Sequence, residues 1–348
     1  MKAVIIKKNC DIIFDDIQEE IMKEDEVKIK VKYTGICGSD VPRALKNGAH
    51  NYPIILGHEF SGEIIEIGSK VNNAKIGDHV VGIPLMPCHE CRDCINGNYS
   101  LCKNYNFVGS RRQGSMAEHI ILNQKNILVI DKNIPLLSAA FFEPSAVAYH
   151  GIDLIGLENK ENACIIGSGN IAFFVFQWLK IYGVKNITIV GKNEKTLKRF
   201  LKYGANHTIN TKSENFNEEI ENVTNGERFY NVFECAGSSE TMNMSLLLAA
   251  NKGRICLIGT PKDPVTLTVK EWETINRKEL TIKGSWMSYS KEFPGKEWTR
   301  TNEEFKKGNL TVPQEIIHKI YPMEKGKEAF EQYNEHISGK VIIENEFF

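Results

Sequence analysis

The middle of the chain carries an alternation of strands and helices that restricts its fold more than any other feature. A run of apolar residues at 163–166 is followed by a glycine-rich turn and a long apolar helical stretch that ends near Tyr182. Further strand candidates follow at 187–190, 231–234 and 254–258. Because short apolar strands that alternate with helices form parallel sheets covered by helices, this region predicts a doubly wound α/β domain.

The part of the chain before residue 150 has a different pattern. Short alternations of apolar and polar residues at 27–31 and 64–81 are interrupted by glycine-rich turns. This pattern is typical of small β-elements. A last strand-like run occurs at 340–343. We therefore expect a β-rich region followed by an α/β region.

Size and charge exclude several classes of protein. The 348 residues suffice for about two domains. Lys and Arg number 43 against 44 Asp and Glu, so no excess positive charge would attract nucleic acid or anionic lipid. No uncharged apolar stretch approaches the roughly 18 residues needed to cross a bilayer, and the short apolar run near the N-terminus does not resemble a signal peptide. We expect a cytoplasmic protein that binds neither nucleic acid nor membranes.

Several of the nine cysteines are clustered in one polar loop with the spacing CxxCxxCx7C. They are Cys88, Cys91, Cys94 and Cys102. Thiolates with this spacing can surround one tetrahedral Zn²⁺ and leave no open position, so the ion would be structural. An iron–sulfur cluster is the main alternative, but the usual ferredoxin runs have other spacings. Unliganded thiols in an exposed loop are a second alternative.

A second candidate metal site has different chemistry. Cys37 lies in the string GICGSD, and His58 and Glu59 follow about twenty residues later. A cysteine, a histidine and a distant carboxylate can bind zinc with three protein ligands, which leaves a position open for water or substrate. From these residues alone, the alternative is a buried packing cysteine and a histidine in a turn.

The turn after the strand at 163–166 reads GSGNIA and opens an apolar helix. In dinucleotide-binding domains such glycines allow a tight turn and a close approach of the backbone to pyrophosphate, whose charge the helix N-terminus meets. An ordinary glycine turn is the alternative, but the strand before and the helix after are the context that a dinucleotide site requires. We predict that the cofactor contacts Gly167, Gly169, Asn170 and Ile171.

The end of the following strand indicates which nicotinamide cofactor is bound. NAD-binding domains usually carry an acidic residue here, about 20 residues after the glycines, to hold the ribose 2′-hydroxyl. This chain has Gly191, Lys192 and Asn193 instead. A glycine leaves space for a 2′-phosphate and a lysine offers it positive charge, so we expect NADP(H) in preference to NAD(H). Glu194 lies just beyond and would support NAD(H) if it reached the ribose.

The strings GICGSD, LGHEFSG, the cysteine loop and FFEPSAVAYH occur in the order and spacing of the zinc-containing medium-chain alcohol and polyol dehydrogenases, which the chain resembles from end to end. This resemblance implies two zinc ions per chain. It implies that Cys37, His58 and Glu143 hold the catalytic zinc, with Glu59 close by and able to exchange with bound water. Ser39 would then relay the substrate proton; a hydroxyl that bonds only its own turn is the alternative.

The same resemblance implies a Rossmann domain and a β-rich, GroES-like catalytic domain. Residues 1–150 would form the catalytic domain, completed by residues 290–348, and residues 151–289 would form the dinucleotide-binding domain. The expected assembly is a homodimer or a homotetramer.

Within the family, the strings at 46–50, 109–112 and 284–289 resemble those of galactitol-1-phosphate 5-dehydrogenases. This implies a phosphorylated polyol and its ketose as substrates. Arg43, Arg111 and Arg112 are candidates to hold the phosphate, because a guanidinium group fits phosphate oxygens, although each could equally form ordinary ion pairs.

Other functions remain open at this point. The chain could act with NAD on an unphosphorylated polyol, a secondary alcohol or threonine, or it could be a catalytically silent nucleotide-binding protein. The intact residues Cys37, His58 and Glu143 argue against a silent protein.

Overall fold

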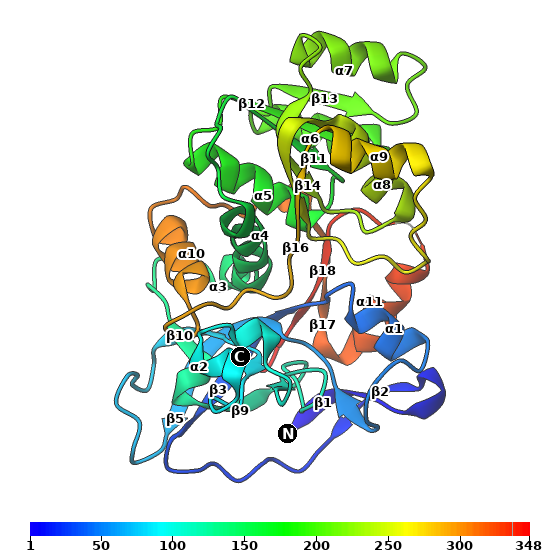
Figure 1. Ribbon diagram of the computed structural model, residues 1–348. Helices are drawn as coiled ribbons and strands as arrows, with labels where there is room; N and C mark the ends of the chain where they lie inside the picture. Colours follow the sequence, from blue (N-terminus) through cyan, green and yellow to red (C-terminus); the bar gives the residue numbers. More distant parts are fainter. Residues whose placement is uncertain (336) are drawn as a thin grey trace. The chain divides into compact units, whose positions relative to one another are not determined.

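The computed structural model describes residues 1–335 and 337–348, and the chain divides into two compact units (Figure 1). Unit 1 consists of Met1–Glu143 and Tyr289–Phe348, and unit 2 consists of Pro144–Ser288. Helix α4 (Phe142–Ile155) carries the chain from unit 1 into unit 2. Within the described ranges, no helix is long and apolar enough to span a bilayer.

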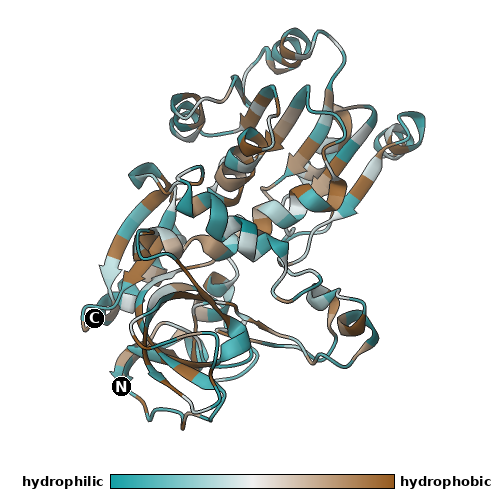
Figure 2. Cartoon of the chain, turned by 90° about the vertical axis from the view of Figure 1, so that its left-hand side faces the viewer, coloured by the Kyte–Doolittle hydropathy of each residue, from teal (hydrophilic) through white to brown (hydrophobic). Residues whose placement is uncertain are grey.

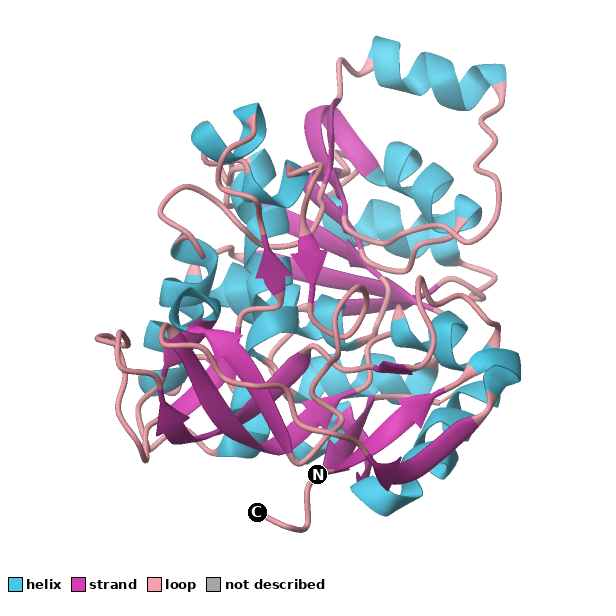
Figure 3. Cartoon of the chain, turned by 90° about the horizontal axis from the view of Figure 1, so that it is seen from below, coloured by secondary structure: helices cyan, strands magenta, loops and turns pink. Residues whose placement is uncertain are grey.

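Unit 1 is built mainly of strands, with short helices between them (Figure 3). The strands are β1 (Lys2–Ile6), β2 (Ile12–Asp16), β3 (Glu26–Gly35), β4 (Ile54–Ile55), β5 (Glu59–Ile67), β6 (His79–Gly82), β7 (Leu85–Met86), β8 (Asn106–Phe107), β9 (His119–Asn123), β10 (Ile127–Val129), β17 (Ile317–Pro322) and β18 (Lys340–Glu344). The α-helices are α1 (Asp40–Leu45), α2 (Arg92–Ile95), α3 (Leu136–Ala139), α10 (Lys296–Lys306) and α11 (Gly326–Glu331). The 3₁₀ helices are η1 (Lys8–Cys10), η2 (Tyr99–Leu101), η3 (Gln124–Asn126), η4 (Gln314–Ile316), η5 (Met323–Lys325) and η6 (Gln332–Asn334).

The largest sheet of unit 1 has the strand order β10-β6-β5-β3-β18-β17, with β9 also paired to β3. Strand β18 pairs antiparallel with β3 and parallel with β17, so the C-terminal segment inserts into a sheet that the N-terminal segment begins. Alternate residues of β3, Val27, Ile29 and Val31, point into an apolar core that Phe60 of β5 also fills. This alternation is the reason the region reads as β from its sequence.

Unit 2 contains one parallel sheet with the strand order β13-β12-β11-β14-β15-β16. Its strands are β11 (Asn162–Ile166), β12 (Asn186–Gly191), β13 (His207–Asn210), β14 (Phe229–Glu234), β15 (Ala249–Leu257) and β16 (Thr281–Gly284). Its helices besides α4 are α5 (Asn170–Ile181), α6 (Glu194–Lys202), α7 (Phe216–Thr224), α8 (Ser239–Leu248) and α9 (Val269–Arg277). The order is that of the Rossmann fold, which confirms the predicted doubly wound sheet.

Apolar residues pack the sheet of unit 2 against its helices. The central strands of this sheet carry buried hydrophobic residues (Figure 2), as expected for strands that helices cover. All residues of α5 from Ala172 to Leu179 are buried, and all of them except Gln177 are apolar, so this part of the helix is enclosed on every side. The strand order reverses between β11 and β14, and the turn after β11 therefore lies at the switch point where such sheets bind ligands.

Candidate catalytic and cofactor sites

Strands β3 and β5 bring the predicted inner metal ligands together in unit 1. Gly35 at the end of β3 pairs with Glu59 at the start of β5. Cys37 follows two residues after the first strand, and His58 immediately precedes the second. A ligand atom from each of Cys37, His58 and Glu59 lies within 4.8 Å of the other two. The structure thus joins residues that the sequence separates by about twenty positions.

The local backbone explains how His58 is presented. The preceding Gly57 has φ +97°, a conformation that residues with a side chain rarely adopt. A Cβ at this glycine would lie 2.6 Å from Thr34 Cγ2 and 2.7 Å from Ser115 Oγ. The His58 ring then packs against the edge of the Phe107 ring, with centroids 5.4 Å apart. His58 and Glu59 are buried, and Cys37 is partly buried.

These residues form a donor set that fits Zn²⁺. A thiol, an imidazole and a carboxylate are the ligands of zinc sites that keep one position open. Burial excludes most competing water from the donors, and the three types of ligand converge on one point. The geometry therefore fits a metal ion with room for a further ligand.

Asp40 organises this cluster, and we did not predict it from the sequence. Its side chain is 0% exposed. One oxygen accepts a hydrogen bond from the backbone N–H of Cys37 (3.1 Å), and the other lies 3.5 Å from His58 Nδ1. Burial lowers the pKa of His58, but the charge and hydrogen bonding of Asp40 together with those of Cys37 outweigh burial and raise that pKa well above its usual value. The sequence signal was the aspartate within GICGSD.

Lys340 is a second residue that the sequence did not reveal. Its Nζ lies 2.8 Å from Oε1 and 2.6 Å from Oε2 of Glu59, and both side chains are buried. Burial lowers the pKa of Lys340, but Glu59 together with the nearby Cys37 and Tyr333 outweighs burial, and the pKa rises above its ordinary value. A cation therefore holds the Glu59 carboxylate that converges with Cys37 and His58.

Glu143 lies near this cluster at the start of α4 but is not one of its converging residues. Removal from water raises the pKa of Glu143, His58 lowers it and Glu59 raises it, and together these effects bring the pKa to about 7. A metal ion that bound this carboxylate would therefore displace a proton below about pH 7.

Ser39 lies beside Cys37, immediately before helix α1. Its backbone N–H points to Cys37 Sγ at 3.5 Å, and its Oγ accepts a hydrogen bond from Arg43 Nη1 at 3.0 Å. Arg43 also donates to Asp40 Oδ1 at 3.3 Å. Two candidate functional residues, Ser39 and Arg43, are therefore bonded to each other.

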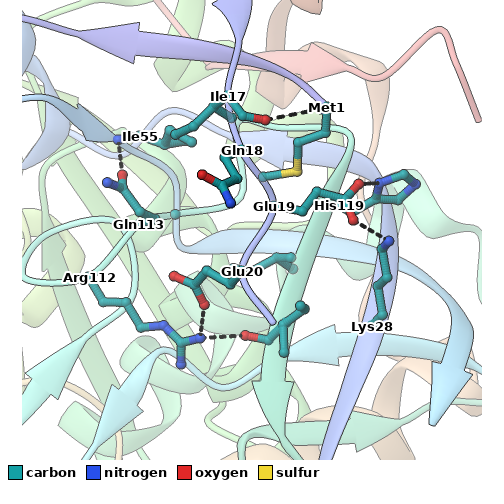
Figure 4. A pocket seen from close by; sticks show the side chains of 13 residues that line it. Met1, Ile17, Gln18, Glu19, Glu20, Lys28, Ile55, Arg112, Gln113 and His119 are labelled. Atoms are coloured by element: carbon teal, nitrogen blue, oxygen red, sulfur yellow. Dashed lines mark hydrogen bonds and ion pairs between the residues drawn. The ribbon is translucent and has the colours of Figure 1, made fainter. Parts of the chain in front are cut away.

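The other two arginines of interest follow strand β8. Arg112 forms an ion pair with Glu20 at 2.6 Å and donates to the carbonyl of Ile121 at 2.9 Å. It lines a pocket of unit 1 that also contains Glu19, Lys28 and His119 (Figure 4). Arg111 is exposed, and its guanidinium lies over the Tyr105 ring, 4.6 Å from the centroid.

The clustered cysteines converge as well. The Sγ atoms of Cys88, Cys91, Cys94 and Cys102 all lie within 4.8 Å of one another. The backbone N–H groups of Cys91 and Cys88 point to the sulfurs of Cys88 and Cys102, at 3.4 Å each. Hydrogen bonds, the largest from the backbone of Cys94, lower the pKa of Cys91 to about 7, whereas burial raises the pKa of Cys94 to about 12. Four converging sulfurs that accept N–H groups fit a closed tetrahedral Zn²⁺ site.

The predicted cofactor turn follows β11 in unit 2. Gly167 has φ +111°, and a Cβ there would meet Ala236 N at 3.3 Å. At Gly169 a Cβ would face open space, so packing within the chain does not require this glycine, whereas a closely approaching ligand does. Helix α5 begins at Asn170 and directs its N-terminus to the same place. The turn therefore fits a pyrophosphate.

Arg199 supports this turn and was not predicted. It is 7% exposed, and its Nη2 donates to the carbonyl of Ser168 at 2.7 Å. The Ser168 hydroxyl in turn bonds Thr196 Oγ1 at 2.6 Å. Helix α6 is thereby connected to the glycine-rich turn.

The end of β12 shows how the residues that would meet a ribose are arranged. A Cβ at Gly191 would lie 3.3 Å from Ser168 Oγ, so little room exists for a side chain there. The Asn193 side chain caps α6 by accepting a bond from the backbone of Thr196. Lys192 is exposed, and the Glu194 carboxylate accepts a bond from Asn210 at 2.6 Å.

Family models and known proteins with similar sequences match most of this chain. Residues 23–132 match the family model "Alcohol dehydrogenase GroES-like domain" and residues 171–301 match "Zinc-binding dehydrogenase". The galactitol 1-phosphate 5-dehydrogenase of Escherichia coli K12 is 38% identical over 309 residues, which cover 88% of this chain and 89% of that enzyme. The D-arabitol-phosphate dehydrogenase of Enterococcus avium is 30% identical over 337 residues, which cover 95% and 93%.

A solved structure supports the same relationship. The crystal structure of galactitol-1-phosphate dehydrogenase from Escherichia coli superimposes with a TM-score of 0.93 and 34% identity, covering 99% of both chains. The fold, the matched domains and the identity to these relatives together show that the chain belongs to the zinc-binding, GroES-like alcohol dehydrogenase family of oxidoreductases.

Proposed function

We propose that the protein catalyses the zinc-dependent interconversion of a phosphorylated polyol and its ketose phosphate with NADP(H). The convergence of Cys37, His58 and Glu59 with Ser39 beside them carries this proposal, because it joins a metal-binding donor set to a hydroxyl that can move a proton. Two relatives support the substrate class, since both are named as dehydrogenases of polyol phosphates.

Each metal has its own proposed ligands. As the family resemblance implies, Cys37, His58 and Glu143 would hold the inner zinc. Glu59, whose carboxylate converges with Cys37 and His58 in the structure, would stay on Lys340 and exchange with the water bound to the metal. The cysteines at 88, 91, 94 and 102 would hold a structural zinc. When bound, the inner zinc supplies a Lewis acid that lowers the pKa of a coordinated hydroxyl.

The residues of the chain then have separate tasks in the reaction. A nicotinamide bound at the glycine-rich turn would take up the hydride from the carbinol carbon. The carbinol hydroxyl would give its proton to Ser39 Oγ while Ser39, which is exposed, passes its own proton to solvent. Asp40 keeps the His58 ring and the Cys37 backbone in place for this step. The reverse reaction reduces the ketone with the same groups.

We further propose that Gly167, Gly169, Asn170 and Ile171 meet the pyrophosphate. At the ribose, Gly191, Lys192 and Asn193 would accommodate a 2′-phosphate. Lys192 is exposed and offers positive charge. The Glu194 carboxylate, which would favour NAD if it reached the ribose, accepts a bond from Asn210 through one oxygen. The exposed lysine supports NADP(H).

The three arginines differ in how freely they could bind a substrate phosphate. Arg43 and Arg112 already pair with carboxylates, so a phosphate would have to compete with Asp40 or Glu20. Arg111 is exposed and lies four residues after Phe107, whose ring contacts His58. We therefore favour Arg111 for the phosphate.

Turnover of galactitol 1-phosphate and of unphosphorylated galactitol, each measured with NADP⁺ and NAD⁺, tests the proposal. We expect higher kcat/KM for the phosphorylated substrate and for NADP⁺. Lys192→Ala should raise KM for NADP⁺ and leave KM for NAD⁺ nearly unchanged, with Lys195→Ala as the matched control. A preference for NAD⁺ would contradict the cofactor assignment, and turnover of galactitol, secondary alcohols or threonine alone would contradict the substrate class.

A further inference from the structure

Both the side chain and the backbone of Arg43 form hydrogen bonds within unit 1. Its guanidinium reaches Ser39 Oγ and Asp40 Oδ1, four and three residues earlier, which is the spacing at which residues on a helix meet. The Arg43 side chain is 19% exposed, and that of Asp40 is 0% exposed. At the backbone, the Tyr52 hydroxyl donates to the carbonyl of Arg43 at 3.4 Å and accepts from Ala49 N–H at 3.1 Å. The arginine is therefore held in one arrangement.

From this arrangement we propose that Arg43 is a positioning residue for the Ser39 hydroxyl and not an anchor for a substrate phosphate. The inference rests on the proposed function, in which Ser39 receives the substrate proton.

The hydrogen-bonding capacity of the serine hydroxyl gives the reason. A hydroxyl has one donor and two acceptor positions, whereas a guanidinium group only donates. Arg43 therefore fills one acceptor position of Ser39 Oγ. One acceptor and one donor position remain. Those are the two positions that a relay needs, one to receive a proton from the substrate and one to pass a proton on.

The positive charge of Arg43 also prepares the Ser39 hydroxyl to relay a proton. A cation bonded to Oγ makes the remaining O–H a stronger donor, and the guanidinium group restricts rotation of the hydroxyl. Without Arg43, this restraint on the hydroxyl is lost, and its hydrogen no longer has one fixed direction.

A role as phosphate anchor agrees less well with these contacts. A phosphate that took over Arg43 would remove a cation from Asp40, whose carboxylate is completely buried. Asp40 would then keep only the Cys37 backbone N–H and His58 as close partners among those described. Removing one member of a buried pair is costly because the other charge stays away from water.

A double-mutant cycle between Arg43→Met and Ser39→Ala tests this proposal, with kcat and KM measured for both galactitol 1-phosphate and galactitol. Ser39→Ala should lower kcat by roughly 10²- to 10⁴-fold, the usual contribution of proton transfer. Arg43→Met should lower kcat at least about 10-fold for both substrates, and by less than about two-fold when Ser39 is already alanine, because residues that act through one group are not additive. Arg43→Lys should restore part of the loss. Lys46→Met, which removes a cation at the end of the same helix, should match the unaltered protein.

Two further measurements separate the alternatives. Zinc content and the calorimetric Kd for galactitol 1-phosphate should both be unchanged in Arg43→Met. A selective rise in KM or Kd for the phosphorylated substrate would assign Arg43 to the phosphate, and loss of zinc would assign it to the metal site; either result overturns the proposal. Additive effects of the two substitutions would overturn it as well. Full activity of Ser39→Ala would instead refute the relay in the proposed function, and the role of Arg43 with it.

Discussion

At the scale of single residues, Lys340 and Glu59 form a buried ion pair beside the proposed zinc ligands. The two residues are 281 positions apart in sequence, and their side chains meet because β18 and β5 both pair with β3. Two buried charges are expensive to remove from water, and their mutual attraction compensates only while both are present. The pair therefore holds the Glu59 carboxylate beside a cation and away from solvent.

Lys340→Met should consequently destabilise the protein, because it leaves the Glu59 carboxylate buried without its cation. A loss of about 3–5 kcal/mol is usual when one partner of such a pair is removed. Thermal unfolding of the zinc-loaded protein measures this as a lower Tm. The double variant Glu59→Gln with Lys340→Met should recover part of the loss. Equal losses in the single and the double variant would show that the charge on Glu59 does not matter for stability.

At the scale of elements, the four-cysteine lobe (residues 88–102) packs against the segment by which the chain re-enters unit 1. The Phe293 ring meets the rings of His89 and Tyr99 with centroids 5.6 and 5.3 Å apart, and it stacks on Tyr289 at 5.8 Å. The Ser100 hydroxyl donates to the carbonyl of Tyr289 and accepts from its N–H, at 3.3 and 3.2 Å. The lobe and the segment 289–293 therefore support each other.

Phe293→Ala should loosen the lobe while it leaves every cysteine in place. Phe293 is partly buried, so its truncation should cost about 1–2 kcal/mol, less than a fully buried phenylalanine. Hydrogen exchange should become faster over 88–102, and a chelator should remove metal from the lobe sooner. Phe347→Ala, at a site that is 52% exposed, is the control. Unchanged exchange in the lobe would show that the ring contacts do not support it.

At the scale of the whole molecule, the proposed metal sites and the proposed cofactor turn belong to different units. The proposed ligands of both metals belong to unit 1, and the glycine-rich turn belongs to unit 2. The two metal sites also differ, since the inner donor set leaves a position open and the four cysteines can close a tetrahedron. Metal should therefore leave the inner site first.

Stepwise chelation should accordingly abolish turnover when the inner zinc is lost, while the lobe keeps its metal. Binding of NADP⁺, followed by fluorescence titration, should persist because the turn at Gly167 requires no metal. Metal analysis at each step relates zinc content to activity, and readdition of Zn²⁺ should restore turnover. Undiminished activity after loss of the inner zinc would refute the proposed mechanism.

The sequence by itself determined the features whose parts are close together in the chain. Alternation of strands and helices predicted the doubly wound sheet, because each element carries its own hydrophobic period. The spacing of Cys88 to Cys102 predicted convergence within one loop, and the glycines at 167 and 169 predicted a turn between a strand and a helix. A short segment fixes such arrangements through its own backbone geometry. The resemblance to known dehydrogenases added Glu143 and Ser39, which no local spacing would have indicated.

The tertiary structure alone decided which groups surround these features. Asp40 beside His58 and Lys340 beside Glu59 depend on strand pairing between distant segments, and no periodicity in the sequence records that pairing. The same holds for the arginines: the sequence offered Arg43 and Arg112 as phosphate ligands, and only folding gave them Asp40 and Glu20 as partners. The reason is physical, since a charged side chain takes its role from whatever charge and burial the fold places within a few ångströms of it.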